Sequence, residues 1–524
     1  MDFYSPLLLG QQQQQQPFAM HLLFFFLALL LLFQLLLQFK NRHFPPGPRR
    51  LPIIGNMLMM DQLTHRGLAK LSEHYGGLVY LRLGFLRTVI VSTPEMARQV
   101  LQVQDNLFSN RPTTIAIRYL TYGRSDLVFA HYGHFWRQMR KLCVMKIFSR
   151  KRAESWVSVR DEVELTLRTV ANGSGSAVNI GEQVFSLGQN ITCRAAFGTY
   201  SHKGQDELVS IMQEFSKLMG AFNVADFIPC IGWFDPQGFN KRLAKARQAF
   251  DCFINDIIDD HIEKRMNKAG NGEEKDTNMV DDLLAFIGDG DENCGGKPDD
   301  LQGSLKLTRD NIKAIIMDVM FGGTETVASA IEWALAELMK HPNELRKVQD
   351  ELTTVVGLDR KVHESDLHKL AYLKCTVKET LRLHPPVPLL LHETTMDCKL
   401  FGYSIPARTR VIINTWALGR DKTAWEDVEA FIPSRFTGEG GVDFKGNHFE
   451  LIPFGSGRRS CPGMQLGIYA LELALAQLLH CFTWTLPDGV KPSELDMSDV
   501  FGLTAPKAIR LVAVPTLRLS CPLF

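Results

Sequence analysis

The chain has 524 residues, of which 22% are charged and 45% apolar, and these ordinary values exclude a disordered or fibrous protein. Lys and Arg (58) balance Asp and Glu (57), and a net charge of +1 argues against a protein that binds nucleic acid mainly through its phosphates. Ten cysteines are too few for a disulfide scaffold, and none has the CxxC spacing of a zinc ribbon or iron–sulfur site.

The first feature along the chain is an apolar run over residues 18–39, dominated by Leu and Phe and free of charged residues. As a helix it would be about 33 Å long, enough to cross the hydrocarbon core of a bilayer. A cleaved signal peptide is the alternative, but it has a shorter apolar region behind a basic start, whereas here the basic residues begin after the run, at Lys40. We therefore predict a retained transmembrane anchor over 18–39, with residues 1–17 as a lumenal tip and the rest in the cytosol.

Prolines restrict the backbone of the next segment, at Pro45, Pro46 and Pro48. Residues 40–52 are therefore predicted to form a stiff hinge between the anchor and one large domain over 53–524. Apolar periodicity predicts helices over residues 161–170, 208–222, 248–268, 309–340, 344–356, 371–383 and 464–479. Short strands are predicted over residues 78–83, 88–91 and 411–414, and a polar surface connector over residues 270–303.

The strongest local signal is the segment 454–463, which reads FGSGRRSCPG. Its three glycines and one proline predict a tight loop whose backbone can approach a flat ligand closely. A helix follows directly, so Cys461 lies at a helix N-terminus, where the dipole and free N–H groups favour a thiolate that can ligate iron. A buried structural cysteine is the alternative, whereas a nucleotide-binding loop is disfavoured because Ser460 stands where its third glycine belongs.

This segment matches the haem-binding signature Phe-x-x-Gly-x-Arg-x-Cys-x-Gly at every fixed position, and through it the chain resembles the cytochrome P-450 family. The fixed positions are Phe454, Gly457, Arg459, Cys461 and Gly463. The resemblance implies a mainly α fold with small β-sheets, behind one N-terminal transmembrane helix. It also implies haem b as the cofactor, with its iron ligated by the Cys461 thiolate.

A second motif, GGTET over residues 322–326, lies in the middle of the long helix predicted over 309–340. Mid-helix glycines cost about 1 kcal/mol each relative to alanine, so their presence needs a reason. By resemblance, this turn holds dioxygen over the iron, Thr326 assists its activation, and Glu325 helps to relay protons. A kinked core helix is the alternative interpretation of these residues alone.

Two further groups of residues resemble structural and cofactor-binding positions of the family. Glu379 and Arg382 lie one above the other at i, i+3, and by resemblance they form a buried brace with Arg435. The family's clamp for the haem propionates resembles a set of donors spread along the chain. These candidates are Trp136, Arg140, His392 and Arg459, with Arg111 as a secondary candidate.

A redox partner is expected, because splitting dioxygen needs two electrons and the chain carries no Rossmann or P-loop fingerprint of its own. Residues 127–153 contain seven Lys or Arg and no acid, which suits the docking of an acidic flavoprotein. A solvated basic face is the alternative. By resemblance to the membrane-bound members of the family, the partner is an NADPH-dependent cytochrome reductase in the endoplasmic reticulum membrane.

The substrate pocket is predicted to be mostly aliphatic and aromatic, which suits a small planar phenol. Its lining is expected from residues 111–131, the helix face before Gly323, and residues 386–392 and 501–504. Three stretches, 317–333, 383–392 and 499–506, closely resemble the plant ferulate/coniferaldehyde 5-hydroxylases of syringyl lignin synthesis. This resemblance implies 5-hydroxylation of ferulate, coniferaldehyde or coniferyl alcohol with O2 and NADPH-derived electrons. The alternatives are a flavonoid ring hydroxylase of the same family and a haem-thiolate sensor or binding protein without turnover.

Overall fold

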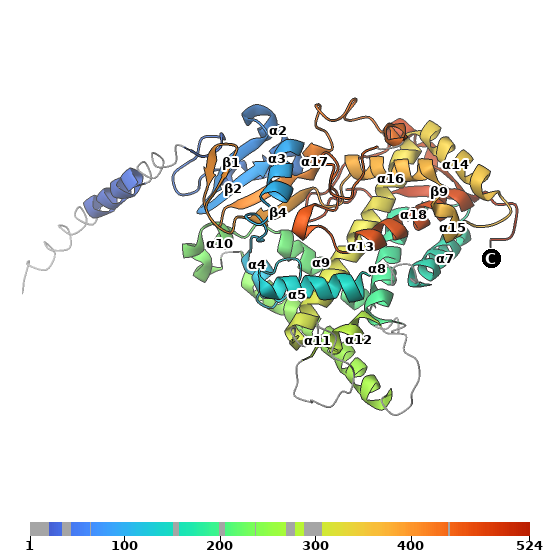
Figure 1. Ribbon diagram of the computed structural model, residues 1–524, viewed down its shortest axis with the longest axis horizontal. Helices are drawn as coiled ribbons and strands as arrows, with labels where there is room; N and C mark the ends of the chain where they lie inside the picture. Colours follow the sequence, from blue (N-terminus) through green and yellow to red (C-terminus); the bar gives the residue numbers. More distant parts are fainter. Residues whose placement is uncertain are drawn as a thin grey trace, which may run out of the picture.

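The computed structural model describes residues 20–33, 43–62, 64–149, 157–198, 205–235, 237–268, 278–287, 306–438 and 441–523. This part of the chain is mainly helical, with three small sheets, so the predicted fold class is confirmed for the body of the protein. Figure 1 shows the largest sheet toward the N-terminal side of the molecule and most of the helices toward the C-terminal side.

The largest sheet has four strands in the order β1-β2-β7-β4. The strands are β1 (Leu78–Leu83), β2 (Leu86–Val91), β7 (Arg410–Asn414) and β4 (Leu389–Glu393). β1 and β2 form an antiparallel hairpin, β2 pairs with β7 in parallel, and β4 pairs antiparallel with β7, which places His392 opposite Val411. Two smaller sheets combine β3 (Val178–Asn179), β9 (Val512–Leu517) and β8 (Phe482–Thr485), and β5 (Cys398–Leu400) with β6 (Tyr403–Ile405).

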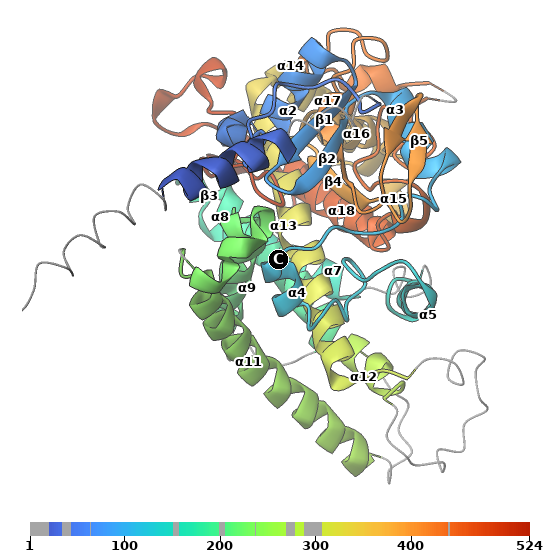
Figure 2. The same cartoon turned by 90° about the vertical axis from the view of Figure 1, so that its left-hand side faces the viewer.

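The helices surround one long central member, α13 (Arg309–Lys340), which begins at a capping box formed by Thr308 and Asn311. The others are α2 (His65–Tyr75), α3 (Pro94–Arg98), α4 (Ile115–Leu120), α5 (His134–Leu142), α7 (Val157–Asn172), α8 (Ile180–Phe197), α9 (Gln205–Gly220), α10 (Val224–Phe227), α11 (Phe239–Lys268), α12 (Met279–Leu284), α14 (Pro342–Val356), α15 (Glu364–Leu367), α16 (Ala371–Leu383), α17 (Thr415–Leu418) and α18 (Met464–Cys481). Figure 2 shows α13 running through the middle of the molecule, with the large sheet on one side and α9 and α11 on the other. Short helical turns used below are η3 (Cys143–Ile147), η4 (Pro229–Phe234) and η6 (Gly457–Arg459).

Two glycines allow α8 to pack directly against α13. A Cβ at Gly188 would lie 2.6 Å from the carbonyl oxygen of Thr324, and a Cβ at Gly323 would lie 2.7 Å from Oγ1 of Thr192. Side chains at either position would force the helices apart, since such contacts are far inside van der Waals distance. Gly322, by contrast, has no neighbour within 4 Å of its ideal Cβ. Close helix packing thus accounts for one of the two mid-helix glycines, and open space lies beside the other.

Most of the predicted elements are present, and two helices and one strand have the predicted bounds: 309–340, 371–383 and 78–83. The surface connector predicted over 270–303 is wrong for residues 279–284. Residues Met279–Leu284 form α12, capped by Asn278, and Met279 and Val280 are buried in the core. Their apolar side chains pack against neighbouring helices, which the polar composition of the surrounding segment obscured. The rest of that segment lies outside the described residues, apart from 278 and 285–287.

Of the predicted anchor, the structure describes the apolar helix Met20–Phe33. It lies outside the body of the molecule in Figure 1, and its large side chains are exposed; Phe26, for example, is 66% exposed. Two longer helices in the described part of the chain, α13 and α18, are apolar enough to cross a membrane, but more than half of each is buried inside the protein. The transmembrane anchor over 18–39 therefore stays a prediction.

The described part of the predicted hinge, from residue 43, lies against the edge of the large sheet. The N–H of Tyr80 in β1 donates to the carbonyl of Pro46 at 2.8 Å, and the ring of Phe44 stacks on Tyr80 with centroids 4.3 Å apart. A Cβ at Gly47 would lie 2.1 Å from the carbonyl oxygen of Tyr80, so glycine allows this close approach. The hinge is thus held by β1.

Candidate functional site

A cavity of about 1680 Å³ lies between α13, α5, the start of β4 and the loop that precedes α18. Six of the residues predicted from the sequence as cofactor-binding or catalytic line this cavity. They are Trp136, Arg140, Thr326, His392, Arg459 and Cys461, and the secondary candidate Arg111 joins them. These seven residues come from five separate segments of the chain. The fold therefore brings the predicted site residues together at one cavity.

The loop 454–463 presents the thiol of Cys461 to the cavity. Gly455 and Gly457 both have a φ of +69°, a conformation that favours glycine, and the N–H of Cys461 donates to the carbonyl of Phe454 at 2.8 Å. Burial raises the pKa of the Cys461 thiol, whereas a hydrogen bond from the N–H of Gly463 and the charge of Arg140 lower it. The site therefore offers a thiolate two stabilising groups and leaves room for a cation in front of the sulfur.

Arg459 points away from solvent and donates to three backbone carbonyls: Ser109 at 2.8 Å, Leu127 at 3.2 Å and Ala130 at 2.6 Å. Its guanidinium carbon also lies 4.3 Å from the ring centre of Trp136. Burial, together with the charge of nearby Arg111, lowers the pKa of Arg459 to about 8. A bound anion at this wall would stabilise the charged form of Arg459.

Arg111 also indicates that an anion binds at this wall. Its Nη1 donates to the carbonyl of Leu391, but its Nε is buried and has no hydrogen-bond partner among the residues that the structure describes. Burial lowers the pKa of Arg111 to about 10. A buried donor without an acceptor is costly, so this atom calls for an anionic group from a ligand. The residues therefore fit haem, whose carboxylates would face Arg111 and Arg459 while its iron faces Cys461.

The other predicted clamp residues have partners within the protein. Trp136 donates from Nε1 to the carbonyl of Leu127 at 3.0 Å, and Arg140 donates from Nη2 to Oγ of Ser460 at 3.4 Å. His392 donates from Nδ1 to the carbonyl of Phe108 at 2.9 Å. Burial, reinforced by Arg111, holds the pKa of His392 well below its usual value, so its ring is neutral and its Nε2 is an acceptor at neutral pH.

The two residues predicted to take part in oxygen chemistry have different surroundings. Thr326 lines the cavity, and its Oγ1 donates to the carbonyl of Gly322 at 2.5 Å. Glu325 lies behind the cavity wall and accepts a hydrogen bond from Oγ1 of Thr504 at 2.7 Å. The expectation that residues 501–504 line the pocket does not hold: none of these four residues lines the described cavity, and Thr504 bonds to Glu325 instead.

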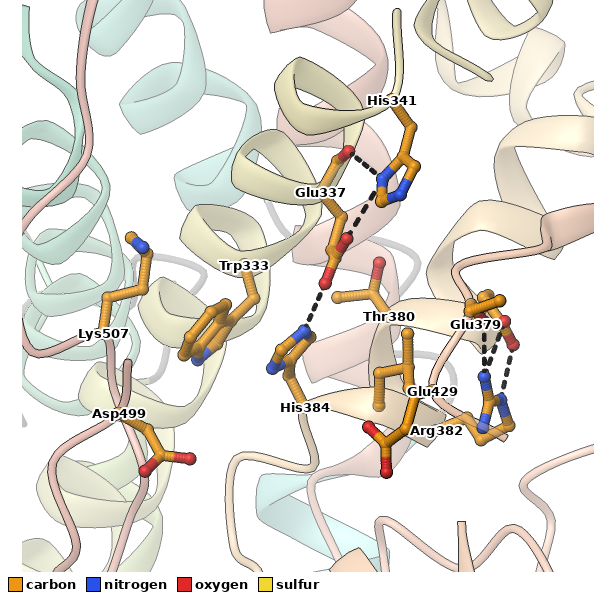
Figure 3. A network of polar contacts seen from close by, with 12 residues as sticks. Trp333, Glu337, His341, Glu379, Thr380, Arg382, His384, Glu429, Asp499 and Lys507 are labelled. Carbon is orange, nitrogen blue, oxygen red and sulfur yellow. Dashed lines mark hydrogen bonds and ion pairs between the residues drawn. The ribbon is translucent and has the colours of Figure 1, made fainter. Parts of the chain in front are cut away.

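Glu379, Arg382 and Arg435 form a buried brace away from the cavity. Two bonds of 2.7 and 2.8 Å join Arg382 to Glu379, whose side chain is fully buried, and Arg435 reaches Glu379 at 3.1 Å. Figure 3 shows Glu379 and Arg382 facing each other, to one side of His384, which directly follows the end of α16. Arg382 also donates to the carbonyls of Gly419 and Val428 at 2.7 Å. The brace thus ties α16 to the segment around residues 419–435.

One pair of acids at the site was not predicted from the sequence. Asp318 on α13 lines the cavity, and Asp126, in the segment between α4 and α5, is fully buried beside it. Asp318 interrupts an otherwise apolar part of the helix, IIMDVMF over residues 315–321, and such an acid is a signal of a functional or packing role. No comparable signal marks Asp126, since its partner lies 192 positions further along the chain.

Comparisons with known proteins agree with this geometry. Residues 45–512 match the sequence profile of the family described as "Cytochrome P450". A protein named "Cytochrome P450 84A1" from Arabidopsis thaliana is 67% identical over 92% of each chain, and "Cytochrome P450 84A4" from the same plant is 59% identical over 92% of this chain and 93% of its own. A solved zebrafish cytochrome P450 with abiraterone superposes with a TM-score of 0.70 at 25% identity, covering 87% of this chain and 99% of its own.

Proposed function

Because the chain belongs to the cytochrome P450 family and is therefore a haem-thiolate monooxygenase that uses O2 and NADPH-derived electrons, we propose that its substrate is a methoxyphenol phenylpropanoid. The reaction is hydroxylation of the aromatic ring at the 5-position of ferulate, coniferaldehyde or coniferyl alcohol. Its place is in the synthesis of syringyl lignin. The resemblance of residues 317–333, 383–392 and 499–506 to the ferulate/coniferaldehyde 5-hydroxylases supports this proposal.

The observation that carries the substrate class is the lining of the cavity beyond Cys461. The lining is mixed, with charged residues such as Arg194, Lys264 and Asp281 in one part of the cavity and a cluster of aliphatic residues from α13, the segment after α4 and the segment 387–390 in another. A flat, weakly polar molecule fits against this aliphatic cluster better than a charged metabolite does. The residues of this aliphatic cluster are Leu127, Val128, Ile315, Val319, Val387 and Leu390. Among them, the carboxyl of Asp318 is a polar group that a phenolic hydroxyl could reach.

The protein's own residues hold the cofactor and handle protons. Haem, when bound through a thiolate, supplies the iron centre at which O2 is activated for insertion into the ring. Cys461 would be the thiolate ligand, and the unpartnered Nε of Arg111 and the remaining N–H groups of Arg459 would hold the carboxylates of the cofactor. Arg140, Trp136 and His392 would line the same wall, and the N–H groups of Trp136 and His392 keep that wall in shape through their bonds to Leu127 and Phe108. Thr326 places a hydroxyl at the cavity wall, and Glu325, paired with Thr504, lies behind it as the group that resupplies the proton.

The same proposal includes a membrane and a redox partner. The exposed Leu and Phe side chains of Met20–Phe33 support a single-pass anchor over 18–39 in the endoplasmic reticulum, with the body facing the cytosol. Arg137, Lys141 and Lys146 are exposed on α5 and η3, and α5 contacts the Cys461 loop through the bond from Arg140 to Ser460. This basic face supports docking of an NADPH-dependent cytochrome reductase close to the haem.

Turnover by the full-length chain in reductase-containing microsomes tests the proposal. Ferulate, coniferaldehyde, coniferyl alcohol and naringenin are offered separately, and ring-hydroxylated products are identified by mass spectrometry. We expect 5-hydroxylated phenylpropanoids and no product from naringenin. Product from naringenin alone would point to a flavonoid hydroxylase. No NADPH consumption with any phenol would point to a binding protein without turnover.

A Cys461→Ser variant is the control for this experiment. It keeps a polar side chain of similar size but removes the thiolate. We expect it to lose both turnover and the Soret band that marks thiolate ligation in the reduced carbon monoxide complex. A variant that kept this band would show that another residue ligates the iron.

A further inference from the structure

Asp126 and Asp318 form a pair of carboxyl groups at the wall of the cavity. Asp126 lies in the segment 124–131, which joins α4 to α5, and Asp318 comes from the middle of α13. The two carboxyls are within hydrogen-bonding reach of each other. Asp126 is fully buried, whereas Asp318 has one side on the cavity.

The pair accepts three consecutive backbone N–H groups of the segment. Oδ2 of Asp318 accepts from Leu127 at 2.7 Å and from Val128 at 3.1 Å, and Oδ2 of Asp126 accepts from Phe129 at 2.8 Å. In the described part of the chain, no donor reaches the buried Oδ1 of Asp126. Two ionised carboxylates in contact would repel each other and leave this oxygen unsatisfied. A proton on one carboxyl, donated to the other, removes both costs.

The surrounding charges favour one negative charge on the pair. Arg111, Arg124 and Arg459 are the cations that face Asp126, and Cys143 on η3 is the titratable group near Asp318. Burial raises the pKa of both carboxyls, and for Asp318 the neighbouring Asp126 raises it further. The cations stabilise one carboxylate, while burial disfavours the second, as in other closely spaced carboxyl pairs.

The backbone that this pair holds is the backbone that supports the haem clamp. The carbonyl of Leu127 accepts from Nε1 of Trp136 at 3.0 Å and from Nη1 of Arg459 at 3.2 Å, and the carbonyl of Ala130 accepts from Nη2 of Arg459 at 2.6 Å. The peptide groups of Leu127 are thus fixed by Asp318 at the N–H and by the clamp at the carbonyl. A shift of the segment would move both clamp side chains together.

We propose that Asp126 and Asp318 share one proton and act together as positioning residues, which hold the segment 124–131 so that Trp136 and Arg459 keep haem in place. This inference rests on the clamp role given to Trp136 and Arg459 under the proposed function. It adds a pH dependence that Asp126→Asn removes, which separates it from any titration of Arg459 in the clamp itself. When the shared proton is lost as the pH rises, the two carboxylates separate, the segment loosens, and haem dissociates faster.

Transfer of haem from the full-length holoenzyme, held in lipid nanodiscs, to excess apomyoglobin measures this effect. For the wild-type chain we expect the transfer rate to rise about tenfold between pH 6 and pH 9, the change that corresponds to one pKa unit of differential stabilisation. In Asp126→Asn, the new amide donates to the Asp318 carboxylate and still accepts from Phe129. This variant should keep the slow rate at every pH.

Asp226→Asn is the matched control. Asp226 is another partly buried carboxyl that accepts a backbone N–H, from Ile115 at 2.6 Å, and burial raises its pKa as well. It has no part in the pair, so this variant should keep the pH dependence of the wild type. A flat wild-type profile, or an Asp126→Asn profile as steep as that of the wild type, would overturn the positioning role.

Infrared titration of the wild type tests the shared proton without relying on any variant's folding. We expect a protonated-carboxyl band near neutral pH that is missing in Asp126→Asn and in Asp318→Asn. Absence of this band in the wild type would overturn the pair itself. Failure of the haem clamp would look different: Arg459→Lys would leave haem transfer unchanged at every pH while the infrared band persisted.

Discussion

Gly457 shows how one residue of the Cys461 loop depends on having no side chain. Its φ is +69°, and a Cβ there would lie 2.2 Å from the backbone carbonyl oxygen of Leu101. Two separate requirements therefore meet at this position, a left-handed backbone and a close approach to a neighbouring segment. Gly489 shares only the first requirement, with a φ of +70° and open space around its Cβ position. Comparing substitutions at Gly457 and Gly489 therefore separates the cost of the backbone conformation from the cost of the close contact.

We predict that Gly457→Ala destabilises the protein by about 3 kcal/mol or more, whereas Gly489→Ala costs about 1 kcal/mol. Both variants pay for an alanine at positive φ, but only the first must also displace the backbone near Leu101. Thermal unfolding followed by circular dichroism measures the two losses. Equal losses at both sites would show that the approach to Leu101 is not a constraint on the loop.

For single residues, the sequence predicted which residues belong to the site better than it predicted the hydrogen bonds that they make. The signature over 454–463 correctly indicated a tight loop with Cys461 at its end, because positive φ values select glycine and leave a mark in the sequence. Trp136 and Arg459 both donate to the carbonyl of Leu127, and no sequence pattern predicted these two hydrogen bonds. A backbone acceptor is the same atom in every residue, so no sequence pattern identifies it.

At the scale of elements, the polar network of Figure 3 joins the end of α13 to the end of α16. Glu337 on α13 pairs with His341 at 3.2 Å and with His384 at 2.6 Å, and the ring of His384 stacks on Trp333 with centroids 3.9 Å apart. Hydrogen bonds from the two histidines outweigh burial and lower the pKa of Glu337 to about 2. Burial lowers the pKa of His384, whereas the hydrogen bond to Glu337 raises that of His341, so His341 is the more readily protonated of the two rings.

The hydrogen bond to Glu337 raises the pKa of His341 above its ordinary value of 6.5. Its contribution to stability is therefore fully present below pH 6.5 and is lost as the pH rises through the raised pKa. We expect His341→Gln to cost up to about 1 kcal/mol at pH 6, limited by solvent screening of a half-exposed ring, and almost nothing at pH 9. Urea unfolding at both pH values checks this.

A double-mutant cycle makes the test specific. In a Glu337→Gln background, His341→Gln should have the same small effect at both pH values, because the partner charge is gone. A pH dependence that survived in this background would assign the effect of His341 to another group.

The contact of α8 with α13 depends on Gly188, which faces the backbone of Thr324 two residues before Thr326. We predict that Gly188→Ala costs about 1–3 kcal/mol, because a methyl group has no room between the helices. Gly467→Ala on α18 is the control: its Cβ would make an ordinary contact at 3.9 Å, so alanine there should gain up to about 1 kcal/mol of helix propensity. Thermal unfolding of the two variants should shift in opposite directions.

Of these two helices, the sequence predicted α13 but not α8. The long apolar pattern of residues 309–340 predicted α13 to the residue, since its capping residue and its apolar length are both visible in the sequence. Helix α8 was missed, although Ile180, Val184, Leu187 and Ile191 follow helical spacing and are buried. Glycines at 181 and 188 weakened the pattern, and their reason lies on the partner helix, which the local sequence does not show.

At the scale of the whole molecule, near-zero net charge conceals a basic face on α5 and η3. Arg137 and Lys141 are exposed there, whereas Lys70 is exposed on α2, on the other side of the molecule in both views. We predict that Arg137→Glu with Lys141→Glu raises the KM for the reductase several-fold and weakens the dependence of turnover on ionic strength. Lys70→Glu should change neither.

Reductase titrations at low and high salt, with one substrate at saturation, measure this difference. Equal effects of the two sets of substitutions would mean that the reductase docks elsewhere. An unchanged CO-bound spectrum in all variants would show that their haem sites remain intact.

The parallel pairing of β2 with β7 sets an order of events during synthesis of the chain. Val91 ends β2 and Arg410 begins β7, so more than 300 residues separate the two strands. At translation rates of ~5–20 residues/s, the ribosome needs roughly 15–60 s to supply the partner strand. Until then the hairpin of β1 and β2 has one open edge rich in Val and Ile, which can pair with other chains. A nascent chain that stalls before residue 410 would therefore be a client for chaperones and proteases.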